Sequence, residues 1–175
     1  MRRTPGIVVL TAILLSTPAY AQDNSTVIAN ALKAAPASIA ENATVMDWEG
    51  NTLRTGSNGW VCFPDPPNMT DAPMCFDGPW QSWAQSWQQK QPVTIDQPGI
   101  AYMLLGDAGA SNVDPYAEGP TAENEWVVTG PHLMLIVPDP ASLSAMSTDP
   151  ANGGPWVMWQ GTPYAHVMIP VAGTP

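Results

Sequence analysis

The spacing of apolar and polar positions changes along the first third of the chain. Apolar residues recur at helical spacing over 27–35, and the polar residues 23–25 before them offer N-cap oxygens. The spacing then shortens to two, which predicts short strands at 44–48, 52–55 and 60–63. Because turn residues separate these strands, we expect them to form a β-meander.

One longer helix is predicted in the middle of the chain. Asp77 and Pro79 are typical of a helix start, and Pro92 ends the pattern. Three tryptophans fall at positions i, i+3 and i+7, on one stripe of this helix: Trp80, Trp83 and Trp87. The opposite side carries glutamines, so we expect an amphipathic helix whose tryptophans pack on the sheet.

Short apolar strands dominate the C-terminal half. They are predicted at 100–105, 132–137, 156–159 and 165–169, with a polar loop at 106–125 and a short helix at 139–146. Only two or three short helices accompany these strands, too few for a parallel sheet with helical crossovers. The predicted fold class is therefore α+β, with a mostly antiparallel sheet.

The first 21 residues have the pattern of a cleavable secretory signal peptide. Arg2 and Arg3 precede an apolar run at 7–15, and small residues occupy positions 19 and 21. The run is shorter than the roughly 20 residues of a membrane span, which argues against a retained anchor. We expect cleavage after Ala21 and residence in the periplasm or outside the cell.

The mature chain is strongly acidic. Removing residues 1–21 removes two of the five basic residues and none of the fifteen acidic ones, which leaves a net charge of −12. This charge disfavours nucleic acid and anionic membranes, and leaves an unknown small molecule or protein as the partner. We expect residues 22–43 to form a helical segment that packs on a single α+β domain, residues 44–175, with no stable membrane insertion after signal cleavage.

The two cysteines predict a disulfide bond. Cys62 and Cys75 both follow the signal peptide, and four prolines lie between them. An exported chain meets an oxidising environment, and two cysteines alone cannot complete a structural zinc site. A free or metal-binding pair is the alternative.

The sequence His-x-Met occurs in two of the predicted strands. Alternation places His132 and Met134 on one face of the first strand, and His166 and Met168 on one face of the second. If the strands pair, two imidazoles and two thioethers share one surface, a ligand set that suits copper, particularly Cu(I). The alternative is packing alone, because methionine fills irregular cores and a strand histidine often bonds a nearby carbonyl.

The familiar catalytic motifs do not occur in the chain. A general-base histidine would have to be His132 or His166, and Asp107 with Ser111 or Ser142 are the candidate partners of a hydrolase triad. Nothing in their spacing singles them out. We therefore expect a non-enzymatic binding or accessory domain, with a copper-handling protein and a hydrolase as the alternatives.

Tryptophan is used far more than phenylalanine, with eight residues against two. Flat indoles bind planar ligands as well as fill cores. Trp126 and Trp156 lie next to turn and glycine-rich segments, so we expect these two to line a ligand surface. The tryptophan stripe of the predicted helix is instead expected in the core.

Short segments spread over the mature chain share a family likeness. They are residues 44–48, 58–60, 130–132, 137–140, 157–159 and 161–166, with Pro170. In these segments, and over nearly all of the mature chain, the protein resembles a family of bacterial secreted proteins with no assigned function. The resemblance implies a bacterial envelope or extracellular setting, and it assigns no activity and no functional residue.

Overall fold

The structure, a computed structural model, describes residues 24–171, so the predicted signal peptide at 1–21 lies outside the described residues. Its helices are α1 (Ser25–Ala31), η1 (Leu32–Ala34), α2 (Ala37–Ala40), α3 (Gly78–Gln88) and η2 (Pro140–Ala145), where η marks a 3-10 helix. Within this range, no helix combines the length and the apolar character that a membrane crossing needs.

Eight strands form one sheet, and two more form a small separate ladder. The sheet strands are β1 (Thr44–Met46), β2 (Thr52–Arg54), β3 (Val61–Phe63), β4 (Met74–Phe76), β5 (Gly99–Met103), β8 (His132–Ile136), β9 (Trp156–Met158) and β10 (His166–Pro170). Their order is β2-β1-β3-β4-β5-β8-β10-β9, while β6 (Ala110–Ser111) pairs with β7 (Trp126–Val127). The mostly antiparallel sheet and the few short helices agree with the prediction, although the sheet dominates the molecule.

The predicted β-meander is wrong at its third strand. β2 pairs antiparallel with β1, but β3 pairs with β1 in parallel and leaves β2 at the sheet edge. The connection crosses back over the start of β1, where Ser57 N–H donates to Asn42 O and Gly56 N–H donates to Thr44 Oγ1. A side chain at Gly56 would collide with the backbone of Ala43 and Thr44. This close crossing returns the chain to the end where β1 begins, so β3 runs in the direction of β1.

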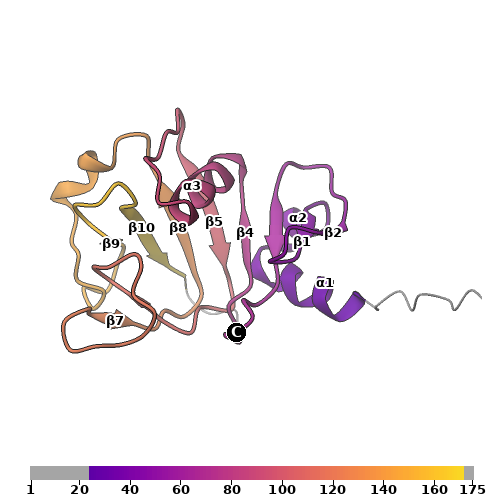
Figure 1. The fold of residues 1–175 in the computed structure, drawn as a ribbon, viewed down its shortest axis with the longest axis horizontal. Coiled ribbons are helices and arrows are strands. Elements are labelled where there is room, and N and C mark those ends of the chain that lie inside the picture. Colours follow the sequence, from indigo (N-terminus) through magenta and orange to yellow (C-terminus); the bar gives the residue numbers. More distant parts are fainter. Residues whose placement is uncertain (1–23, 172–175) are drawn as a thin grey trace, which may run out of the picture.

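Different helices cover the two faces of the sheet (Figure 1). α3 packs over β4, β5 and β8, where Trp80 contacts Phe76 and donates its indole N–H to Met134 O. On the opposite face η1 packs on β3 and β4, and Leu143 of η2 packs against Val167 of β10. The core is therefore split into layers on both sides of the sheet.

The predicted disulfide is present. Cys62 and Cys75 occupy directly opposite positions of antiparallel β3 and β4, with Cα atoms 4.0 Å apart. Both cysteines are fully buried, and Ala31 and Ala34 pack against them. Closing a loop of this size stabilises the fold by roughly 3 kcal/mol in the chain-entropy model.

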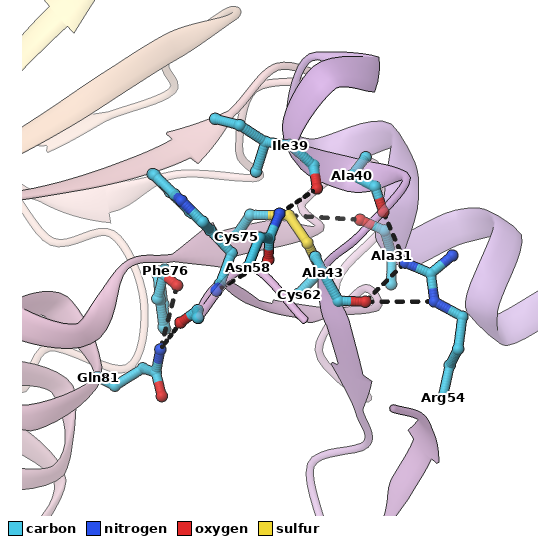
Figure 2. The surroundings of a disulfide bond; sticks show 12 residues. Ala31, Ile39, Ala40, Ala43, Arg54, Asn58, Cys62, Cys75, Phe76 and Gln81 are labelled. Carbon is cyan, nitrogen blue, oxygen red and sulfur yellow. Dashed lines mark hydrogen bonds between the residues drawn. A yellow bond between two sulfur atoms is a disulfide. The ribbon is translucent and has the colours of Figure 1, made fainter. Parts of the chain in front are cut away.

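Side-chain hydrogen bonds to backbone carbonyls at the end of α2 and just after it attach this segment beside the bridge (Figure 2). Arg54 Nη2 donates to the carbonyl oxygens of Ala40 and Ala43, at 2.6 Å each. Asn58 Nδ2 donates to Ile39 O at 2.8 Å. The ends of short helices leave such carbonyls without intrahelical partners, so these side chains complete the helix termini.

α3 begins at the predicted residue because of its N-cap. The Asp77 carboxylate accepts the N–H of Trp80 at 3.0 Å and the N–H of Ile100 at 2.7 Å. One side chain therefore caps the helix and joins it to β5. The stripe faces the sheet as expected, and Trp80 and Trp83 are buried.

Candidate functional site

The two His-x-Met strands lie side by side in the sheet. β8 and β10 pair antiparallel with Met134 opposite Met168, and both methionines lie in the core beneath α3. The two histidines lie at opposite ends of this methionine pair. His132 is opposite Pro170, which is four residues along β10 from His166. The Cα atoms of His132 and His166 are therefore about 13 Å apart along the strands.

The neighbouring strands add two further methionines. β5 places Met103 opposite His132, and β9 places Met158 opposite His166. Opposite residues in antiparallel strands have Cβ atoms about 5 Å apart, so each imidazole has a thioether beside it on the next strand. We call this surface the His–Met face. Its members are Met103, His132, Met134, Met158, His166 and Met168.

Backbone carbonyls hold both imidazoles in the same tautomer. Nδ1 of His132 lies 2.7 Å from Gly130 O, and Nδ1 of His166 lies 3.0 Å from Tyr164 O. A carbonyl oxygen can only accept, so each Nδ1 carries the proton and each Nε2 presents a lone pair. His132 Nε2 is buried and has no hydrogen-bond partner among the described residues.

Burial keeps both histidines uncharged at neutral pH. Burial lowers the pKa of His166 to about 4. The hydrogen bond to the Tyr164 carbonyl opposes this shift, and the charge that His132 carries when it is protonated reinforces it. Burial also lowers the pKa of His132, against the opposing effects of the Gly130 carbonyl and the Asp107 carboxylate. Both Nε2 atoms are therefore free of protons at pH 7.

Three indoles surround His166. The rings of Trp80, Trp83 and Trp159 meet the imidazole edge to face, with centroids 5.7, 5.6 and 4.9 Å away. Trp159 reaches this position from a left-handed backbone, φ 56°, and its indole N–H donates to Ser111 O at 2.7 Å. A left-handed non-glycine residue costs roughly 1 kcal/mol, so this hydrogen bond and the ring contacts hold Trp159 in place.

A pocket of about 570 Å³ opens over the His–Met face. The floor is the His–Met face itself, with Met74 and Phe76 beside it. The walls include six indoles: Trp48, Trp80, Trp83, Trp87, Trp126 and Trp159. The volume is that of a site for a small organic molecule, and the lining is mainly apolar.

One corner of this pocket carries polar acceptors. Asp107 Oδ2 lies 4.0 Å from His132 Nε2, while Asp107 Oδ1 accepts the N–H groups of Gly109 and Thr129 at 3.0 and 2.9 Å. The Thr129 hydroxyl is buried without a hydrogen-bond partner in residues 24–171. Asp107 and His132 line the pocket, and we call this pair the acceptor corner.

Trp126, on β7, packs on the turn that carries Asp107. Gly109 has φ 110°, and a side chain there would collide with the indole of Trp126. Only glycine combines this backbone angle with so close an approach. The turn therefore sets an indole beside the acceptor corner.

The two tryptophans predicted to line a ligand surface lie in different places. Trp126 is half-buried and lines the pocket. Trp156 is 2% exposed, lies in the core cluster, and donates its indole N–H to Asn112 Oδ1. The stripe of α3, expected only in the core, also forms a wall of the pocket.

The candidate triad serines do not face the histidines as nucleophiles. The hydroxyl of Ser111 donates to Asn124 O and accepts the N–H of Asp114, so it shapes a turn. Ser142 lies on η2 and donates to Asp139 O. In the described part of the chain, no three side chains of His, Cys, Asp or Glu gather as a metal site; methionine is outside that set.

Sequence reasoning missed three residues that complete the site: Met103, Met158 and Trp159. Alternation alone could have placed Met103 and Met158 on a strand face, but only the strand order shows which histidine each one faces. Trp159 was expected within a strand, whereas its left-handed backbone ends β9 and turns the indole toward His166.

Comparison with protein-family models, with curated proteins and with solved structures gives no match for this chain. The site is therefore interpreted from its own chemistry.

Proposed function

We propose that this chain is an exported, non-enzymatic binding protein that holds a small, largely apolar molecule in the pocket over the His–Met face. One observation carries the proposal: a pocket walled by indoles and floored by thioethers contains a buried His132 Nε2 that has no hydrogen-bond partner within residues 24–171. Apolar walls bind a ligand by burying its surface, and a few convergent polar atoms orient it.

The composition of the pocket suits recognition by shape and apolar contact. Methionine side chains are flexible and polarizable, so a floor built from them adapts to an irregular ligand. The indoles supply large rigid surfaces on which a flat group can stack. The thioethers of the His–Met face come from the sheet, and three of the six indoles come from α3, which favours a preformed site.

The groups near the pocket favour binding over hydrolysis. In a hydrolase triad the acid bonds to Nδ1 of the histidine and a free hydroxyl faces Nε2. Here the Gly130 carbonyl occupies Nδ1 of His132, and the Asp107 carboxylate faces Nε2. Ser111, the nearby serine of the pocket, uses its hydroxyl within its own turn.

An extracytoplasmic location completes the proposal. The Cys62–Cys75 bridge is of the kind that forms in oxidising compartments. The N-terminal signal pattern leads to the same compartment. We therefore place the protein in the periplasm or the extracellular medium of a bacterium, in line with the family resemblance of its sequence.

Binding of N-phenyl-1-naphthylamine, an uncharged apolar fluorophore at neutral pH, tests the pocket. We expect its fluorescence to rise on addition of the wild-type protein, with saturation at one site. Ala84 lies on α3 and lines the pocket, so Ala84→Phe fills part of the cavity and weakens binding by about tenfold or more, the effect of roughly 1.4 kcal/mol. Gln85→Phe, on the exposed side of the same helix, adds the same ring and leaves binding unchanged.

Far-UV circular dichroism checks that both variants fold. Equal affinity of the folded Ala84→Phe variant and the wild type would place the fluorophore elsewhere and contradict the proposed pocket. No saturable binding by the wild type would reject it outright.

The His–Met face favours a second candidate function, the handling of Cu(I). Nε2 of each histidine presents a lone pair, and each Nδ1–H is fixed by a carbonyl, the arrangement that orients metal-binding histidines. Met134 and Met168 lie directly opposite each other between the histidines. Thioether and imidazole ligands together suit Cu(I).

Competition for Cu(I) against a chromophoric chelator tests this second function. We expect the wild type to retain Cu(I), and Met134→Leu and Met168→Leu to bind it at least about tenfold more weakly, because leucine keeps the volume and removes the sulfur. Met146→Leu is the matched control, since Met146 is exposed beside η2, outside the His–Met face. Transfer of all copper to the chelator by the wild type, or equal binding by all variants, would exclude the copper function.

A further inference from the structure

The charged side chains that line the pocket are all acidic, apart from the histidines. Asp107, Asp114 and Glu118 line it, and the described residues of its lining include no lysine or arginine. Of the three basic residues in the described chain, Arg54 binds carbonyls beneath the N-terminal helices and Lys33 lies on η1, across the sheet. Lys90 lies over the ring of Tyr116, 4.6 Å from its centroid. Carboxylates within low-dielectric walls create a negative potential that attracts cations.

The acceptor corner needs a hydrogen-bond donor. The Gly130 carbonyl takes the Nδ1 proton of His132, so His132 Nε2 is an acceptor, and it faces the carboxylate oxygen Asp107 Oδ2 at 4.0 Å. A donor group located between them bonds to both at ordinary lengths of about 2.8 Å.

An aromatic side chain borders this corner. Trp126 packs directly on Gly109, whose N–H binds Asp107. The charge of the corner and its hydrogen-bond acceptors select the same kind of group, a positively charged donor.

We propose that the ligand is an apolar primary amine, bound with its ammonium group in the acceptor corner and its apolar body over the His–Met face. This inference rests on the proposed binding function. An ammonium group has donors for both acceptors of the corner, His132 Nε2 and Asp107 Oδ2, and a charge for the carboxylate. An alcohol of the same shape has one donor and no charge, and a carboxylate is repelled.

Three probes that share a phenylbutyl body and differ in the polar end group distinguish an amine, an alcohol and a carboxylate ligand. They are 4-phenylbutylamine, 4-phenylbutan-1-ol and 4-phenylbutyrate. Each displaces N-phenyl-1-naphthylamine from the full mature protein at pH 7 and low salt. We expect the amine to bind about tenfold or more tightly than the alcohol, since a hydrogen bond to a charged group contributes about 1.5–3 kcal/mol. The carboxylate should bind most weakly. Salt should reduce the preference for the amine.

Asp107→Asn tests the corner itself. Asparagine keeps an oxygen for the N–H groups of Gly109 and Thr129, so the turn is retained while the charge is lost. We expect the amine's advantage over the alcohol to fall below about threefold, with the alcohol's affinity unchanged. Asp139→Asn, at the N-cap of η2 across the sheet, is the matched control and should keep the full advantage.

Two results would overturn the amine inference: equal affinities of amine and alcohol for the wild type, or an undiminished preference in Asp107→Asn. Either one, with N-phenyl-1-naphthylamine still bound and still sensitive to Ala84→Phe, would leave the proposed binding function standing. Loss of the fluorophore signal itself would reject both.

Discussion

Replacing Trp80 by alanine is expected to lower the free energy of unfolding by about 4 kcal/mol, the range measured for large aromatic truncations in cores. Trp80 is 2% exposed and stacks on Phe76 with ring centroids 5.8 Å apart. It also meets Trp83 at 4.5 Å and donates its indole N–H to Met134 O. Truncation leaves a cavity between α3 and the sheet, and removes a hydrogen bond. Urea denaturation followed by circular dichroism measures the loss.

Two variants separate the contributions of ring and N–H. Trp80→Phe keeps an aromatic ring and removes the donor, so the expected loss is smaller, about 1–2 kcal/mol. Trp87→Ala, on the same stripe but only half-buried, should also cost less than Trp80→Ala. Equal losses for Trp80→Ala and Trp87→Ala would contradict the view that Trp80 anchors α3 to the sheet.

Acidification from pH 7 to pH 4 is expected to cost about 3 kcal/mol of folding stability through His166 alone. Above pH 6.5 the histidine is neutral in the folded and unfolded chains, so it contributes nothing to the pH dependence. Below pH 6.5 the unfolded chain takes up a proton that the folded chain refuses, because burial lowers the folded pKa to about 4. Stability therefore falls with pH across this window, at up to about 1.4 kcal/mol per unit.

His132 adds to this loss, because its pKa is lowered in the same direction. Urea unfolding at intervals between pH 7 and pH 4 measures the slope. The double variant His132→Asn, His166→Asn is the control: the asparagine amide can still donate to the Gly130 and Tyr164 carbonyls, and it does not titrate. Its slope should be nearly flat in this window. A slope as steep as that of the wild type would show that other groups cause the acid sensitivity.

Local signals in the sequence predicted the elements that depend on neighbouring residues. α3 starts where Asp77 and Pro79 indicate, because an N-cap acts within one turn of helix. The strands that carry the histidines occur close to their predicted positions, since alternation is a property of each strand alone. The disulfide was predicted from the two cysteines and the signal-peptide pattern that precedes them.

The pairing of β3 with β1 was beyond such reasoning. Turn residues between consecutive strands favour a meander, and nothing local shows that Gly56 crosses the backbone of Thr44. The contact of Gly56 with Thr44 joins two segments that lie on either side of the β1–β2 hairpin. It therefore depends on the pairing of β1 with β2.

By itself, the sequence determined that this chain carries an export signal pattern, a disulfide, an acidic surface and two strands with His-x-Met on one face. These follow from composition and from periodicity within single segments. Only the tertiary structure decided that Met134 faces Met168, that tryptophans enclose His166, and that Asp107 lies 4.0 Å from His132 Nε2. The reason is that strand order, register and the path of the 106–125 loop depend on how distant segments bury their apolar faces against one another, a choice that no single segment encodes.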